Sequence, residues 1–296
     1  MAALVDLVDR ASAADVTSLV TDLADAPMHV GAVLLLGAST GWELGAAIEA
    51  LEVRSRSVPR LRQRLQSAPF GCGRPFWVDD PAFSIDRHVT SSPCTGGSDI
   101  NAVLRVAADI VGRPLPRDRP LWSATFVTGL DAGQVGLVVV FHHVLADGIG
   151  GLAVLANLVD GPDPSPAPEL AGTAQAAPGT GALWLDATRA RLDQVSGLPG
   201  AIRSGVSAIA AMRSDRPHRN TSVTNLHGPE TSLAVLGAVV SDVIPISVAT
   251  GNVTVSFAVL SYAGKLTVTV IADPRACPDL QSLTHLLQDE LASLVQ

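Results

Sequence analysis

Two adjacent histidines end one of the most apolar runs in the chain. Residues 138–143 read Val-Val-Val-Phe-His-His, and Asp147 and Gly148 complete the pattern His-His-x-x-x-Asp-Gly. An imidazole has an unperturbed pKa of about 6.5, so it accepts protons near neutral pH and suits general-base catalysis. The pattern therefore predicts a site at which a histidine takes a proton from a bound substrate.

The expected backbone around this motif is a strand, a sharp turn and a helix. Side chains alternate between the faces of a strand, so His142 and His143 are expected to point in opposite directions. Gly148 and the glycines that follow it allow the backbone to turn into a helix over residues 152–158. Asp147 is expected to hold the loop through backbone amides or a buried cation.

Two other interpretations of the histidine pair stay open. The first is a purely structural or surface role, which is common for a lone histidine. The second is a metal site, which is disfavoured because adjacent strand histidines diverge and no other His, Cys or Asp cluster has ligand spacing. The three cysteines (Cys72, Cys94 and Cys277) are far apart and form no CxxC pair, so a reducing compartment fits better than a disulfide framework. We expect no metal.

The first half of the chain is expected to alternate strands and helices around this motif. Its hydrophobic periodicity predicts a strand at 32–36, a helix at 42–54, an extended segment at 83–89, a helix at 99–111, and a hairpin of strands 121–127 and 134–140. A Pro/Ala/Gly-rich linker at 160–178 comes next. The second half predicts helices within 184–212, strands at 233–240, 253–260 and 265–271, and an amphipathic helix at 279–295.

Composition excludes several classes of protein. The 296 residues are 47% hydrophobic and only 16% charged, and the formal net charge is -8. A nucleic-acid binder would need clustered cations, so this balance argues against one. The N-terminal residues lack the pattern of a signal peptide, and the apolar runs are shorter than the roughly 20 residues that a membrane-spanning helix requires. Contact with a membrane is therefore expected only at its surface.

Several segments together with the histidine motif resemble one family. These segments are Pro-Met-His-Val-Gly at 27–31, Val-Pro-Arg-Leu-Arg-Gln-Arg-Leu at 58–65, Gly-Arg-Pro-Phe-Trp-Val-Asp-Asp at 73–80, Arg-Pro-Leu-Trp at 119–122, Thr-Asn-Leu-His-Gly-Pro at 224–229 and Leu-Ser-Tyr-Ala-Gly-Lys-Leu at 260–266. They resemble the bacterial wax ester synthase/acyl-CoA:diacylglycerol acyltransferases, within the CoA-dependent acyltransferase superfamily. The segment at 58–65 resembles a helix of that family, and its arginines would form a solvated face or meet CoA phosphates.

The resemblance implies an O-acyltransferase that moves a fatty acyl group from acyl-CoA to diacylglycerol or to a long-chain alcohol. His143 would be the catalytic base, Asp147 would hold the loop, and His142 and Gly148 would support them. Pro120, Leu121 and Trp122 would shape the acyl or acceptor channel, although core packing explains Trp122 equally well. Acyl-CoA would be a co-substrate, with no bound cofactor. The expected location is cytoplasmic, at a membrane or lipid-droplet surface.

The resemblance also predicts an α/β fold, a CoA-dependent acyltransferase-like mixed sheet with flanking helices. We expect an N-terminal lobe at 1–159, a linker with helices at 160–222, and a partial C-terminal lobe at 223–296. The second lobe would be incomplete, because the linker leads almost directly into Thr224 and the family's Asn-Asp motif is missing. This favours a second hypothesis, a catalytically degenerate relative that binds lipid or pairs with an intact paralogue, and it leaves a homo- or hetero-oligomer open. Transfer to a carrier protein is a third, disfavoured hypothesis.

Overall fold

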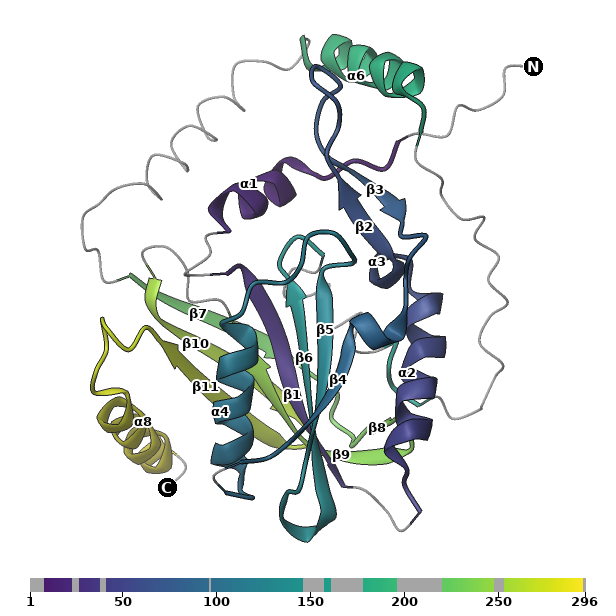
Figure 1. Cartoon of the computed structure of the whole chain (residues 1–296). Helices are drawn as coiled ribbons and strands as arrows, with labels where there is room; N and C mark the ends of the chain where they lie inside the picture. The colour runs from purple at the N-terminus through teal and green to yellow at the C-terminus, as the bar shows by residue number, and fades with distance from the viewer. Residues whose placement is uncertain are drawn as a thin grey trace.

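The computed structural model describes residues 8–22, 27–37, 41–95, 97–145, 157–160, 178–195, 220–247 and 253–294. Within these ranges the strands form three sheets (Figure 1). The largest sheet has six strands in the order β4-β5-β6-β1-β9-β8, a second has the order β11-β10-β7, and a third pairs β2 with β3. The fold is therefore a mixed α/β arrangement, as the sequence predicted.

The six-stranded sheet positions the histidine motif. Its strands are β1 (His29–Gly37), β4 (Val89–Pro93), β5 (Trp122–Thr128), β6 (Gln134–His142), β8 (Ala234–Val235) and β9 (Ala238–Ile246). β1 runs antiparallel to both β6 and β9, β5 and β6 form an antiparallel hairpin, and β4 runs parallel to β5. The β1–β6 register places His29 directly opposite His142.

Two helices cover opposite faces of this sheet, α2 (Leu44–Ser57) and α4 (Ile100–Val111) (Figure 1). Leu34 on β1 belongs to the same buried cluster as Leu51 of α2, whereas its neighbour Leu35 belongs to the cluster that contains Val103 of α4. Alternate side chains of a strand point to opposite faces, so the two clusters lie on the two sides of the sheet. Coverage on both faces explains why β1 reads as an uninterrupted apolar run.

The smaller elements complete the fold. They are α1 (Ala13–Thr21), α3 (Pro59–Arg62), β2 (Gln63–Gln66), β3 (Phe76–Asp79), η1 (Ile85–Arg87), η2 (Asp131–Gly133), α6 (Thr180–Val195), β7 (Asn220–His227), β10 (Val253–Tyr262), β11 (Lys265–Ala272) and α8 (Leu280–Leu294). The C-terminal sheet is tied to the large one through Tyr262, whose hydroxyl donates to Val240 O at 3.0 Å and accepts from Leu233 N at 2.8 Å.

Most of the predicted elements are confirmed. The strand at 32–36, the helices at 42–54 and 99–111, and the hairpin at 121–140 match β1, α2, α4 and β5–β6. In the second half, β10, β11 and α8 match the predicted strands and final helix. The predicted helix at 184–212 corresponds in part to α6, and residues 196–212 lie outside the described ranges, as does most of the linker. The strands β2, β3, β4 and β7 and the helix α1 were not predicted.

Three local predictions were wrong. Residues 83–89 are not extended, because η1 forms before β4 begins at Val89. The predicted strand at 233–240 is two strands, because Leu236 and Gly237 form a turn with φ of 55° and 78° and their amides donate to the Asp160 carboxylate. The helix expected over 58–65 ends at Arg62, where Gln63 becomes extended and pairs with Asp79.

The proposed division at 1–159, 160–222 and 223–296 stays a prediction. β8 and β9 of the third segment lie in the same sheet as β1 of the first. Asp160, at the start of the second segment, binds both the β8–β9 turn and the guanidinium of Arg54 on α2. The first and third segments therefore share a sheet and a common set of contacts.

Candidate active site

The histidine pair lies where β6 ends. His142 is the last residue of the strand, and its amide donates to Leu121 O at 2.9 Å. Its side chain is buried, with a relative exposure of 1%, whereas His143 begins the following turn and is half-buried. The prediction that both histidines belong to the strand is therefore corrected, because the ladder ends at His142. The turn brings His143 to a partly exposed position.

Backbone hydrogen bonds fix the turn around His143. Its own amide donates to Met28 O at 2.7 Å, and the next amide, that of Val144, donates to His142 Nδ1 at 3.0 Å. Leu145 N donates to His142 O at 2.9 Å. Both amides that flank the His143 Cα are thus held, one by the segment before β1 and one by the neighbouring imidazole.

The close approach of β1 to β6 depends on Gly31. A Cβ at this position would lie 2.1 Å from the Val139 carbonyl oxygen, so no side chain fits there without movement of the backbone. Gly31 therefore allows β1 to pair with β6 next to the histidine end. This contact gives a structural reason for the glycine of the Pro-Met-His-Val-Gly segment.

Asp22, just after α1, was missed by the sequence analysis. Its Oδ1 accepts from Met28 N at 2.9 Å, and its Oδ2 accepts from Arg117 Nη2 at 2.7 Å. The same Oδ2 lies 3.2 Å from His142 Nε2, a close contact whose geometry is not that of a hydrogen bond, and 13% of the Asp22 side chain is exposed. The only sequence signal is a single acid five residues before Pro27, and such a signal does not distinguish Asp22 from a surface carboxylate.

The protonation of these groups follows from their surroundings. Burial lowers the pKa of His142 to about 4 against the attraction of Asp22, so its ring is neutral at pH 7. Burial alone would raise the pKa of Asp22, but the Met28 amide, the Arg117 guanidinium and His142 together hold it below its usual range. An amide can only donate, so the bond from Val144 makes Nδ1 of His142 the acceptor. The proton of the neutral ring therefore sits on Nε2 and faces Asp22.

His29 on β1 lies directly opposite His142 and is also buried. The sequence analysis assigned it no role. Its Nδ1 is 2.9 Å from Val111 O, and its ring lies edge-on to that of His142, with 6.1 Å between centroids. Burial lowers its pKa. Among the described residues, no group of three or more His, Cys, Asp and Glu side chains is arranged to hold a metal ion.

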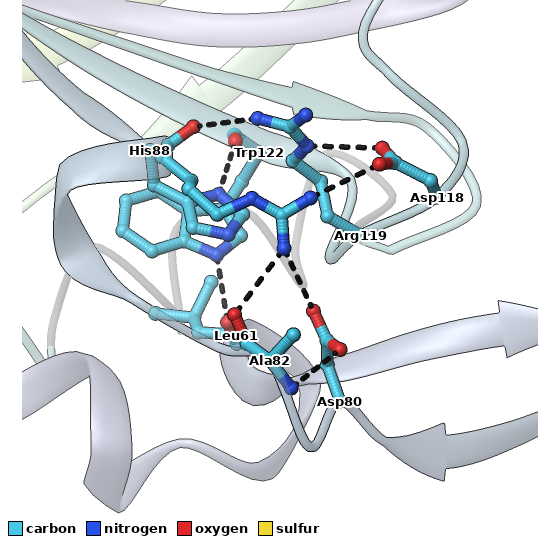
Figure 2. Close-up of polar contacts among 8 residues, drawn as sticks. Leu61, Asp80, Ala82, His88, Asp118, Arg119 and Trp122 are labelled. Carbon is cyan, nitrogen blue, oxygen red and sulfur yellow. Dashed lines mark hydrogen bonds and ion pairs between the residues drawn. The ribbon is translucent and has the colours of Figure 1, made fainter.

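Pro120, Leu121 and Trp122 lead into β5 and are all buried. The Trp122 indole donates to Leu61 O at 2.7 Å and stacks on His88, with 4.6 Å between ring centroids (Figure 2). These contacts account for Trp122 by core packing. The role of the three residues in a substrate channel stays a prediction.

The arginines at 60–64 do not form an unpaired helix face. Arg60 pairs with Asp9 at 2.8 Å and lies over the Trp77 ring, and Arg62 pairs with Asp79 at 2.9 Å. Arg60 and Arg62 therefore join α3 to β3 and to the segment before α1. Asp147, Gly148 and residues 152–156 of the helix expected at 152–158 lie outside the described residues, which stop at Leu145 and resume with a turn at Asn157. Their predicted roles are carried by the sequence alone.

Comparison with known proteins identifies the family. The profile of the wax ester synthase/diacylglycerol acyltransferase catalytic domain matches residues 12–241, and that of the family's C-terminal domain matches residues 195–295. The chain therefore belongs to the wax ester synthase/diacylglycerol acyltransferase family.

Two relatives from Mycobacterium tuberculosis illustrate the similarity. The protein named probable diacyglycerol O-acyltransferase tgs3 is 32% identical over 209 residues, which is 70% of this chain and 76% of the relative. MT3172 is 36% identical over 161 residues, which is 53% of this chain and 34% of the relative. The match thus spans about a third of the length of MT3172.

Solved structures share the fold at low sequence identity. The wax ester synthase/diacylglycerol acyltransferase from Marinobacter aquaeolei VT8 superposes with a TM-score of 0.69 at 16% identity, covering 97% of this chain and 98% of that one. A mutant starter condensation domain of rhizomide synthetase RzmA gives a TM-score of 0.58 at 12% identity, covering 91% and 90%. These matches confirm the predicted fold. Within the described ranges, no helix is both long and apolar enough to span a membrane.

Proposed function

We propose that this chain is an acyl-CoA-dependent O-acyltransferase that acylates diacylglycerol or a long-chain alcohol. The observation that carries the proposal is the half-buried His143, held by hydrogen bonds on both flanking amides at the end of β6. An imidazole carried on a fixed backbone at a partly open position suits general-base catalysis on a hydroxyl. Membership of the family supports the same reaction.

In the proposed reaction His143 accepts the proton of the acceptor hydroxyl while the hydroxyl oxygen attacks the thioester carbonyl of acyl-CoA. The carbon–oxygen bond of the ester forms and the carbon–sulfur bond breaks. The imidazolium then returns the proton to the CoA thiolate, so ester and free CoA leave and the enzyme is regenerated. Acyl-CoA serves as co-substrate, and we propose no further cofactor.

The other predicted residues have supporting roles in this proposal. Asp147 and Gly148 shape the loop after the histidines, and His142 holds the Val144 amide rather than the substrate. Pro120, Leu121 and Trp122 would border the hydrophobic path of the acyl chain or the acceptor at the start of β5, the strand that pairs with β6, in addition to the core packing of the Trp122 ring.

A transfer assay with labelled palmitoyl-CoA and either diacylglycerol or hexadecanol tests the function. His143→Ala is expected to lower kcat by about 10²–10⁴-fold, the usual contribution of a positioned general base. His285→Ala, at an exposed position on α8, is the matched control and is expected to retain activity. Equal rates for the parent and His143→Ala would refute the assignment. Binding of palmitoyl-CoA without product would support the alternative of a degenerate lipid-binding relative.

We further propose that the chain acts at the surface of a membrane or lipid droplet, where its lipid acceptor resides. Three exposed apolar side chains support this location. Phe70, between β2 and β3, is fully exposed at 102%, and Trp184 and Leu185 on α6 are 45% and 64% exposed. A Cβ on Gly71 would lie 2.8 Å from the Trp184 ring, so the loop and α6 are neighbours (Figure 1). Aromatic and aliphatic side chains grouped in this way suit a lipid interface.

Co-sedimentation with phosphatidylcholine vesicles containing diacylglycerol tests this location. Replacement of Phe70 by Ser is expected to weaken binding by about tenfold, because burial of such a side chain in lipid contributes one to a few kcal/mol. Leu266→Ser on β11, which is 61% exposed, is the matched control. Equal binding of the Phe70→Ser and Leu266→Ser proteins would exclude this surface.

A further inference from the structure

Both peptide groups next to His143 depend on groups that Asp22 holds. The His143 amide donates to Met28 O, and the Val144 amide donates to His142 Nδ1. Met28 N and His142 Nε2 are in turn the two groups, apart from Arg117, that contact the Asp22 carboxylate. Two separate chains of contacts therefore run from one carboxylate to the backbone on either side of the predicted base.

The first chain passes through the peptide groups at Met28. Asp22 Oδ1 accepts from Met28 N at 2.9 Å, and Met28 O accepts from His143 N at 2.7 Å. Met28 lies immediately before β1, so its bond with His143 is the first backbone contact beyond the His29–His142 pair. The carboxylate therefore sets the position of the carbonyl that receives the His143 amide.

The second chain passes through the His142 ring. Nδ1 accepts from Val144 N only when the proton of the neutral ring is on Nε2. Asp22 Oδ2, 3.2 Å from Nε2, favours this tautomer because a carboxylate attracts the N–H and repels a bare nitrogen lone pair. Arg117 keeps the carboxylate charged, since its guanidinium donates to the same oxygen at 2.7 Å.

We propose that Asp22 is a positioning residue for the acyl-transfer reaction, which fixes the backbone of His143 through Met28 and through the tautomer of His142. The inference rests on the proposed function, in which His143 is the base. Asp22 does not contact the reacting atoms in this proposal. Its effect is to hold the His143 imidazole in the geometry that proton transfer needs.

Asp22→Asn is the sharpest variant, because an amide cannot satisfy both chains. If its oxygen accepts from Met28 N, its NH₂ group faces the Nε2–H of His142 and the donors of Arg117. If it is reversed, the NH₂ group faces the donating Met28 amide. We expect kcat to fall by about 10²-fold, as for a displacement of about 1 Å in a catalytic group. The KM for palmitoyl-CoA is expected to change much less.

Three comparisons separate positioning from mere stability. Asp22→Glu, which keeps the charge, is expected to recover part of kcat. Asp109→Asn alters an exposed carboxylate on α4 that pairs with Arg113; it is the matched control and is expected to keep the parental kcat. All rates are expressed per folded molecule, with the folded fraction taken from circular dichroism. A parental kcat in folded Asp22→Asn would overturn the proposal.

A measurement on the unaltered chain keeps the proposal testable if Asp22→Asn does not fold. In ¹⁵N-histidine spectra at pH 7, His142 is expected to be neutral with its proton on Nε2, its signals being assigned with His142→Gln. A proton on Nδ1 would overturn the proposal. This spectrum needs no activity, so the absence of acyl transfer by the parent chain would refute the proposed function while the tautomer still tests the Asp22 contact.

Discussion

His142 and His88 are both almost completely buried, yet their surroundings give them opposite tautomers. His142 accepts a backbone hydrogen bond at Nδ1 and directs Nε2 toward the Asp22 carboxylate. His88, in contrast, has its Nδ1 at 2.9 Å from the Trp122 carbonyl oxygen. A carbonyl oxygen only accepts hydrogen bonds, so Nδ1 of His88 carries the proton. The Nε2 atom of His88 is then unprotonated.

The His88 environment is a stack of aromatic rings. His88 lies between Phe83 and Trp122, with centroid distances of 5.3 Å and 4.6 Å and interplanar angles of 28° and 12°. Neither its buried Nε2 nor that of His142 makes a hydrogen bond of good geometry among the described residues, but His142 Nε2 has the Asp22 carboxylate at 3.2 Å. Figure 2 shows His88 and Trp122 beside Arg119 and Asp118. Arg87 and Arg119 both donate to the Asp118 carboxylate. The contacts of His88 are those of a packing residue.

The comparison shows that burial alone does not distinguish a histidine that contacts the His143 turn from one that only packs in the core. Burial lowers the pKa of both side chains, and for His88 the charges of Arg119 and Arg87 lower it further. The difference lies in what the second nitrogen faces and what the ring holds in place. His142 links a carboxylate to the turn that carries His143, whereas His88 links one aromatic ring to another.

The largest expected effect on stability comes from removal of the ring on which His88 stacks. Trp122→Ala is expected to lower the free energy of unfolding by about 3–5 kcal/mol, because it leaves a cavity and an unpaired Leu61 carbonyl. Urea denaturation of the parent and the variant at pH 7 measures this loss of unfolding free energy. A loss below about 1 kcal/mol would mean that the stack is not part of the stable core.

The next effect is the pH dependence that His142 adds. Its pKa falls from 6.5 in the unfolded chain to about 4 in the folded one, so the unfolded state binds more protons between these pH values. Stability is therefore highest above pH 6.5 and falls as the pH drops toward 4, by about 3 kcal/mol from this group. Lowered pKa values of His29 and His88 act in the same direction.

Urea denaturation over this pH range, compared between the parent chain and His142→Gln, isolates the contribution of His142. The variant is expected to show a shallower decline, whereas His285→Gln on α8 should retain the parental slope. If the unfolding free energy of His142→Gln fell with pH as steeply as that of the parent chain, the pH dependence would belong to other groups.

His88→Phe has a smaller expected effect and sharpens the functional side of the comparison. A phenyl ring retains the stack but leaves Trp122 O without the Nδ1–H donor, so the free energy of unfolding should fall by about 1 kcal/mol. Activity per folded molecule should stay that of the parent, whereas His142→Phe should lower kcat. Equal losses of kcat in the two variants would remove the distinction between the two histidines.

The smallest effect is expected at the rim of the His88 region. Asp118→Asn weakens contacts with Arg87 and Arg119, but the carboxylate is largely exposed, at 62%. Water and salt screen such pairs, so the melting temperature should shift by no more than repeat measurements do. A shift comparable to that of His88→Phe would show that the surface charges support the aromatic stack.

The sequence was most informative where periodicity is long and clear. The strand at 32–36, the β5–β6 hairpin and the helix at 99–111 follow from apolar spacing alone, and the structure confirms them. Asp22 and Arg117 lie 95 residues apart and share no pattern, so only the fold brings them together. The turn at Leu236 and Gly237 was missed for a similar reason, because its stabilising carboxylate, Asp160, is distant in sequence.

The order and type of residues in the chain determined the family, the mixed α/β class and the histidines at the end of β6. These properties depend on local periodicity and on contiguous motifs, which can be recognised in the sequence before the fold is known. Only the tertiary structure decided that His142 faces Asp22, that Met28 and His142 hold the amides around His143, and that His88 belongs to an aromatic stack. A tautomer depends on the donors and acceptors that surround a ring, and distant segments supply them through folding.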